Sequence, residues 1–200
     1  MTNPTDQQKP VSTSTKVEDL FALIHEIDLC MLTTRGDDGA LVSRPMSTQH
    51  HKHLDESKDL WFMTRTDTHK VDEIERNPDV NLGYNKEGEW VSVSGTARVV
   101  TDRQTIRELY DPSWKAWLED NGGAEDGGPN DPRIALIVVA VDRAVYFKRT
   151  SSKPVMYFQI ARAMLTGTPP KLGEERFVDA NAIASVDRSG PTIGNPTPRA

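Results

Sequence analysis

Four residues in the first half of the chain carry groups that can bind an anion together. Arg44 lies in a β-like run, and Thr64, Thr68 and Lys70 lie where a second such run gives way to a helix start. Arginine forms forked, charge-assisted hydrogen bonds to phosphate, and the first N–H groups of a helix favour negative charge. The spacing therefore predicts one phosphate site shared by a strand and a helix start. Residue types alone leave open a second interpretation, a surface arginine and a solvated lysine.

The elements that must position these groups are mostly short strands, because apolar and polar residues alternate over much of the chain. The predicted strands are 29–34, 40–48, 59–64, 80–84, 90–100, 134–141 and 144–148. The predicted helices are 17–27, 68–77, 102–118 with a break at Asp111 and Pro112, and 154–165. Pro45 lacks a ladder donor, which predicts an edge or a bulge beside Arg44. Asp142 and Arg143 are expected to form a turn between the last two strands.

Six or seven short strands with helices between and after them predict a mainly β protein with flanking helices. This pattern is typical of a small antiparallel barrel and not of a parallel sheet with crossover helices. Residues 1–15 are rich in Thr, Ser, Pro and Gln, which predicts a disordered tail before a single domain over 16–166. Residues 167–200 are expected to be a mostly extended or disordered second tail.

The composition limits the binding partners and the cellular compartment that we expect for this protein. The net charge of −6 offers no general field for nucleic acid or anionic lipid, so a basic site must be local. The single cysteine, Cys30, excludes an internal disulfide framework and suits a reducing compartment. The chain has no secretory signal and no apolar run of membrane-spanning length. We therefore expect a cytoplasmic protein that binds neither nucleic acid nor membranes.

The histidine tract and the single cysteine are two other candidate sites, and for both we expect a structural role and no chemistry. His50, His51 and His53 form a tract that could bind metal, but no second ligand cluster accompanies it, so a solvated loop without metal is expected. Cys30 alternates within a strand and is expected to be a small buried side chain. The sequence identifies no catalytic residue.

Five segments, taken in order, resemble the FMN-binding split-barrel superfamily that includes pyridoxamine phosphate oxidases, and most closely its general stress protein 26 branch. The resemblance covers about residues 17–165. The segments that carry it are Cys30-Met-Leu-Thr-Thr34, Ser43-Arg-Pro-Met46, Leu60-Trp-Phe-Met-Thr64 leading to Lys70, Asn77-Pro-Asp-Val80 and Trp90-Val-Ser-Val-Ser-Gly-Thr-Ala97.

The resemblance implies a homodimeric split β-barrel of Greek-key antiparallel strands, with two FMN sites at the subunit interface. FAD is the alternative flavin. By position, Arg44, Pro45 and Met46 would line the flavin. Trp90 would approach its ring from the fifth strand, and Phe147 stands where many relatives have tryptophan.

The same resemblance implies that Thr64, Thr68 and Lys70 hold the ribityl and phosphate groups. Met63 and His69 stand where pyridoxamine phosphate oxidases have tyrosine and arginine. Histidine in place of arginine would weaken the phosphate contact and make it depend on pH near neutrality.

The implied activity is that of a flavin-dependent oxidoreductase linked to a stress response, with an unknown small-molecule substrate or reductant. The C-terminal Arg/His motif that binds the pyridoxal substrate is missing, because residues 173–177 do not match it, so vitamin B6 oxidation is not expected. The alternative is a non-catalytic flavin-binding stress or sensor protein. Haem or deazaflavin binding on the same fold is a third, weaker alternative.

Overall fold

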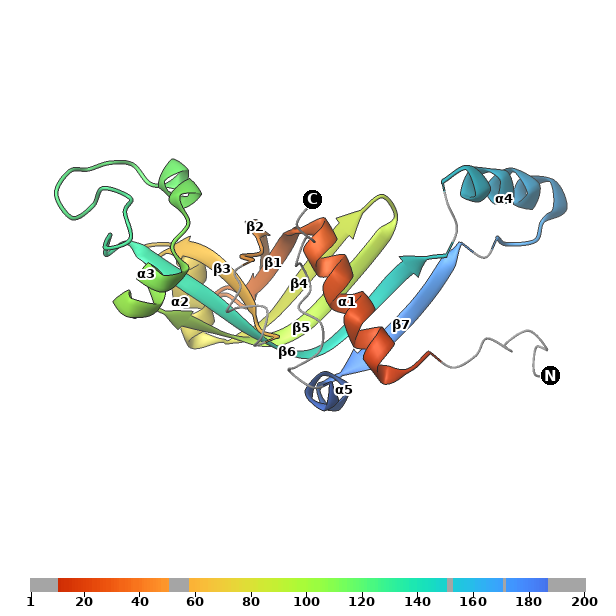
Figure 1. Ribbon diagram of the computed structural model, residues 1–200, viewed down its shortest axis with the longest axis horizontal. Helices are drawn as coiled ribbons and strands as arrows, with labels where there is room; N and C mark the ends of the chain where they lie inside the picture. The colour runs from red at the N-terminus through yellow and green to blue at the C-terminus, as the bar shows by residue number, and fades with distance from the viewer. Residues whose placement is uncertain (1–10, 51–57, 151–152, 171, 187–200) are drawn as a thin grey trace, which may run out of the picture.

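A computed structural model describes residues 11–50, 58–150, 153–170 and 172–186 (Figure 1). The strands are β1 (Leu29–Arg35), β2 (Leu41–Ser47), β3 (Leu60–Arg65), β4 (Asp79–Lys86), β5 (Glu89–Val100), β6 (Ile134–Arg149) and β7 (Gly173–Asp179). The helices are α1 (Thr13–Ile27), α2 (His69–Arg76), α3 (Arg103–Leu109), the 3₁₀ helix η1 (Pro112–Trp117), α4 (Lys153–Thr166) and α5 (Ala180–Ser185). The predicted mainly β class with flanking helices is confirmed. No helix in these residues is long and apolar enough to cross a membrane.

The strands form one antiparallel sheet in the order β2-β1-β4-β5-β6-β3, and β7 pairs with β6 as well. The sheet curls, because the chain just after β2 bonds to β3 at the other end of the path: the Gln49 backbone N–H donates to the Trp61 carbonyl over 2.7 Å. β2 has β1 as its one ladder partner in the described chain, so Pro45 lies on an edge strand, where a missing donor is tolerated.

Two apolar clusters hold the fold together. The larger one fills the concave side of the sheet, where α1 packs against β4, β5 and β7 (Figure 1). Leu20 of α1, Leu32 of β1 and Phe62 of β3 are fully buried there. The smaller cluster lies between α3 and η1 on one side and β3 and β6 on the other, and contains Ile106 and Trp114.

One prediction is wrong at Asp142 and Arg143, where the chain continues without a turn as the 16-residue strand β6. The register of β5 and β6 shifts between Ser94 and Gly95, so Asp142 is an extra residue opposite this step. Its carboxylate accepts a hydrogen bond from the Thr96 hydroxyl at 3.1 Å. A bulge therefore stands where the charged pair was expected to form a turn.

The structure contradicts part of each expected tail. Residues 13–15 belong to α1, because the Ser12 side chain accepts the Thr15 N–H and caps the helix. The expectation of an unpacked tail from residue 167 is wrong for residues 173–185. In that segment β7 pairs with the second half of β6, and Val178 and Ile183 are buried against the main cluster. The boundaries of the domain stay a prediction.

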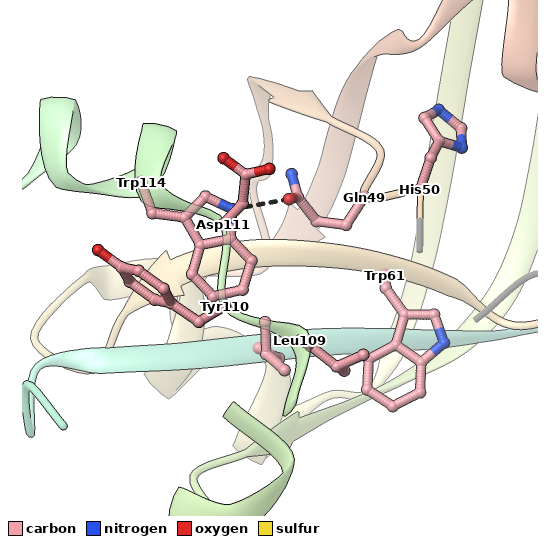
Figure 2. A pocket seen from close by; sticks show the side chains of 8 residues that line it. Gln49, His50, Trp61, Leu109, Tyr110, Asp111 and Trp114 are labelled. Carbon is pink, nitrogen blue, oxygen red and sulfur yellow. Dashed lines mark hydrogen bonds between the residues drawn. The ribbon is translucent and has the colours of Figure 1, made fainter. Parts of the chain in front are cut away.

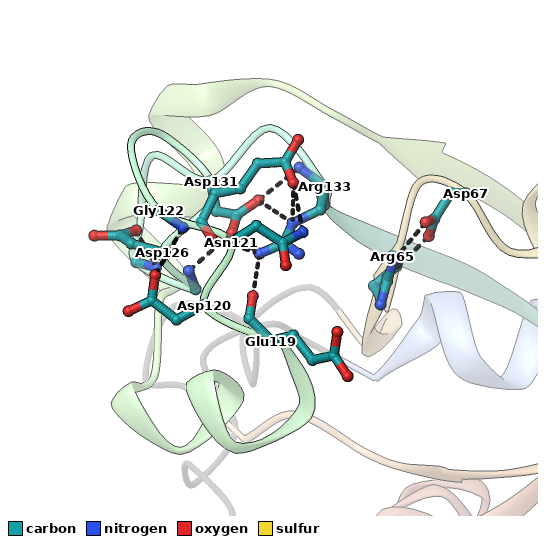
Figure 3. Close-up of polar contacts among 12 residues, drawn as sticks. Arg65, Asp67, Glu119, Asp120, Asn121, Gly122, Asp126, Asp131 and Arg133 are labelled. Atoms are coloured by element: carbon teal, nitrogen blue, oxygen red, sulfur yellow. Dashed lines mark hydrogen bonds and ion pairs between the residues drawn. The ribbon is translucent and has the colours of Figure 1, made fainter.

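A buried ion pair fixes the loop that follows η1 (Figure 3). The Asp131 carboxylate, fully buried, accepts hydrogen bonds from the Arg133 guanidinium and from the Gly127 N–H. These donors hold the pKa of Asp131 down at about 2, chiefly through Arg133. Arg133 also donates to the carbonyls of Glu119 and Glu125, so the loop satisfies its own polar groups and supports the smaller cluster.

Candidate functional site

Arg44 on β2 is held by Glu73 on α2. Its Nη1 donates to Glu73 Oε2 and its Nη2 to Oε1, each over 2.8 Å, and Nη1 also donates to Thr34 Oγ1 over 2.8 Å. The Thr34 hydroxyl in turn donates to Glu73 Oε2 over 2.6 Å. The side chains of Arg44 and Glu73 are 24% and 10% exposed. Forked contact of this kind restricts the guanidinium in direction as well as position.

The Glu73 carboxylate remains charged in this setting. Hydrogen bonds from Arg44 lower its pKa below the ordinary value, and they outweigh the burial that acts in the opposite direction. Three of the five guanidinium N–H groups of Arg44 are thus used by contacts that the structure shows. The Nε–H and one Nη2 hydrogen, on a single edge of the guanidinium, are left for another acceptor.

Lys70 lies one residue inside α2, beside two hydroxyls. Its Nζ donates to Thr64 Oγ1 over 3.3 Å, and Thr64 Oγ1 lies 3.3 Å from Thr68 Oγ1. Thr68 precedes the helix, but its hydroxyl donates to the Arg65 carbonyl instead of capping α2. The first turn of α2 therefore presents backbone N–H groups next to an amine and two hydroxyls, which is a set of donors suited to an anion.

Electrostatics link Lys70 to Arg44. Burial lowers the pKa of Lys70 most, and the positive charge of Arg44 lowers it further. Both effects penalise the ammonium ion, and the attraction of a bound anion would offset both. The structure thus brings Arg44, Thr64, Thr68 and Lys70 together at the junction of β2, β3 and α2.

Other residues predicted for the site lie apart from this group. Cross-strand register places Arg44 in one row with Leu32, Leu82 and Val93, on the concave side of the sheet. Trp90 is three residues from Val93 and pairs with Phe147 of β6, so both aromatic residues face the opposite, convex side.

The remaining predicted residues have varied surroundings. Met46 packs at the edge of the larger cluster, whereas Pro45 points to the convex side and is exposed. Met63 packs with Trp61 in the smaller cluster. His69, the first residue of α2, is exposed.

A small cavity lies between β3 and the α3–η1 segment (Figure 2). Trp61 and Trp114 line it, and Trp114 Nε1 donates to Gln49 Oε1 over 2.8 Å at its rim. It encloses about 50 Å³. Pockets for cofactors enclose about 300–1,000 Å³, so this cavity does not hold a three-ring cofactor.

The histidine and cysteine predictions have separate outcomes. His50 Nδ1 lies 3.2 Å from His25 Nδ1, and His50 Nε2 lies 3.3 Å from Asp28 Oδ1. His51 and His53 lie outside the described residues. Within the described residues, no group of three or more metal-binding side chains is placed to hold an ion. Cys30 is buried as predicted, and burial raises its pKa to about 12, so it is a poor nucleophile.

Sequence reasoning missed Glu73 and Thr34. Glu73 is buried on α2 with Val71 and Ile74, but helical spacing does not place it on the face that those two apolar residues share, so the sequence carried no signal for it. Thr34 does occupy an inward position of β1, and alternation along that strand is the signal that could have identified it. A charged or hydroxyl side chain in a buried position needs a hydrogen-bond partner, and here Arg44 is the partner of both Glu73 and Thr34.

Comparisons of the sequence and of the structure with known proteins point to the same family. The sequence profile described as pyridoxamine 5'-phosphate oxidase like matches residues 15–171. The protein bli-3 of Neurospora crassa is 34% identical over 174 residues, 85% of this chain and 82% of that protein. A structure of general stress protein 26 from Jannaschia sp. CCS1 has a TM-score of 0.63 at 23% identity, covering 82% of this chain and 98% of that one. The general stress FMN/FAD binding protein of Xanthomonas citri has a TM-score of 0.55 at 27% identity, covering 69% and 92%.

Proposed function

Because the chain belongs to the pyridoxamine 5'-phosphate oxidase-like family, we propose that it binds FMN and serves as a flavin-dependent oxidoreductase. The observation that carries this proposal is the cluster of Lys70, Thr64 and Thr68 at the start of α2, with Arg44 alongside. The name of the similar Xanthomonas citri protein, an FMN/FAD binding protein, supports a flavin as the ligand.

The residues present fit the phosphate end of FMN. The ammonium of Lys70, the two threonine hydroxyls and the open edge of the Arg44 guanidinium are all donors, and the helix start adds backbone N–H groups. When bound, the flavin would supply the redox chemistry, and the protein would orient it and limit the access of water. FAD, whose diphosphate bears charge at the same end, is the second flavin to test.

The ring end requires a second subunit in this proposal. Trp90 and Phe147 lie on the convex side of the sheet, away from Arg44, so one chain does not place them over its own cofactor. A homodimer would instead supply, from the partner subunit, the surface that covers the ring.

The proposal is tested by titrating purified protein with FMN and with riboflavin, following flavin fluorescence. Riboflavin has the same ring and no phosphate, so the ratio of its dissociation constant to that of FMN reports the phosphate contact. We expect Lys70→Met to weaken FMN binding by about tenfold or more, as loss of a charged hydrogen bond predicts, and to leave riboflavin binding unchanged. Lys115→Met, on the exposed side of η1, is the matched control. Wild-type protein that binds neither flavin would refute the proposal.

A non-catalytic flavin-binding stress or sensor protein is the second candidate. It is favoured by the commitment of Glu73 to Arg44 and of Lys70 to the threonine hydroxyls, because these ionisable groups then serve binding at the phosphate end. Reduction of the bound flavin by NADH or NADPH, followed by its absorbance, separates the two candidates. Rapid reduction and reoxidation support the oxidoreductase, and stable oxidised flavin in the presence of both reductants supports the sensor.

A further inference from the structure

A carboxylate inside a site for a phosphate needs a physical reason. Glu73 is buried, and the hydrogen bonds from Arg44 keep its carboxylate charged near neutral pH. Its negative charge opposes the binding of an anion nearby, and it offsets the charge of the arginine that the family resemblance assigns to the flavin. This unfavourable charge is compensated if Glu73 holds a neighbouring side chain in the orientation that binding requires.

The contact between Glu73 and Arg44 determines which part of the guanidinium is available. The carboxylate takes the end of the group, one oxygen on Nη1 and one on Nη2, both at 2.8 Å. Thr34 takes the second hydrogen of Nη1. The edge formed by Nε–H and the second Nη2 hydrogen is then the remaining fork, and its direction is set by Glu73 and Thr34, which lie at fixed positions on α2 and β1.

We propose that Glu73 is a positioning residue for the flavin phosphate, acting through Arg44. It holds the guanidinium so that its remaining edge meets the phosphate held by Lys70 and the threonine hydroxyls. The inference rests on the proposed flavin function and adds to it a residue that does not itself touch the ligand. A preformed fork loses less conformational entropy on binding than an arginine that must first be ordered.

The test uses a variant that keeps the charge and removes the geometry. Glu73→Asp retains the carboxylate but draws it back by one methylene, so it no longer spans both Nη atoms. The readout is the ratio of the riboflavin to the FMN dissociation constant, with thermal unfolding as a check that the protein is folded. We expect this ratio to fall about tenfold in Glu73→Asp, a loss typical of a misplaced binding group, with riboflavin affinity unchanged. Glu75→Asp makes the same substitution on the exposed face of α2 and is expected to leave the ratio at its wild-type value.

A second variant keeps the inference testable if Glu73→Asp does not fold. Arg44→Lys keeps the positive charge but lacks the fork, so the ratio is expected to fall by a similar factor. If Glu73 acts through Arg44, the double variant loses no more than either single variant, as expected for residues that form one unit.

The outcomes separate the inference from the function on which it rests. An unchanged ratio in Glu73→Asp, or losses that multiply in the double variant, would overturn the positioning role while flavin binding stands. Equal loss of FMN and riboflavin would show that the ion pair only joins α2 to β2, which also overturns it. Wild-type protein without affinity for either flavin would remove the proposed function and this inference together.

Discussion

Lys70 is the residue whose charge the proposed phosphate contact requires. Its pKa lies below the ordinary 10.5 because of burial and the neighbouring Arg44. A bound phosphate stabilises the ammonium form, so the pKa of Lys70 rises on binding. FMN affinity is therefore full below the lowered pKa and is lost as the pH rises through it.

The measurement is the FMN dissociation constant from neutral pH to above 10.5, divided at each pH by that of riboflavin. The ratio cancels ionisation of the ring, which both ligands share. Lys70→Arg is expected to remove the decline, because the guanidinium stays protonated over this range. A wild-type ratio that is independent of pH would show that the amine does not contact the phosphate.

Sequence reasoning grouped side chains that lie together where these are close along the chain, and their role in binding stays a prediction. Thr64, Thr68 and Lys70 fall within one turn region, and the structure links them by hydrogen bonds. Glu73 was missed because its partner Arg44 is 29 positions away. From sequence alone, a glutamate in a charged helix is expected to face solvent, and only the curled sheet brings β2 under α2.

The long strand β6 is the element on which the sheet is assembled. Its first half pairs with β3 and its second half with β7, while β5 pairs with it from Leu136 to Phe147. The register step at Ser94 and Gly95 lies where β6 changes partner. A side chain at Gly95 would meet the Ala140 carbonyl oxygen at 2.3 Å and Val139 Cγ1 at 2.7 Å, so only glycine fits this close approach.

Gly95→Ala is therefore expected to lower the free energy of unfolding by about 2–4 kcal/mol, because the backbone of β6 must move. Gly83→Ala is the matched control, since a Cβ on this strand glycine meets nothing within 4 Å. Its unfolding free energy is expected to stay within about 1 kcal/mol of wild type or to rise. Urea denaturation measures both. Equal stability of the two variants would contradict the role given to the bulge.

At the scale of elements, periodicity predicted most strands because inward and outward positions alternate clearly in β1, β3, β4 and β5. It failed at the middle of β6, because charged residues in a bulge resemble those in a turn. It also failed at β7, whose short mixed sequence buries Val178 but leaves Phe177 exposed. Residues 173–179 form a strand because they pair with the second half of β6, and the local sequence does not reveal that pairing.

The convex side of the whole sheet carries apolar side chains that the described chain leaves exposed. A single cross-strand row runs over Pro45, Met31, Gly83, Ser92, Val145 and Phe177. Met31 and Phe177 in this row are 44% and 53% exposed, and Leu29 next to it is 55% exposed. Such a face is suited to pack against a second copy of itself about a two-fold axis.

We expect the wild-type protein to sediment as a dimer, and Met31→Asp to shift it towards monomer. A charge placed in an apolar interface loses its hydration without a partner, and the dimer dissociation constant is expected to rise about a hundredfold or more. Trp117→Asp is the control, because Trp117 is 76% exposed on η1, outside this row. If the partner completes the ring site, Met31→Asp weakens FMN and riboflavin equally, whereas Lys70→Met weakens FMN alone. A wild-type monomer that binds FMN at full strength would contradict the shared site and leave the phosphate contact intact.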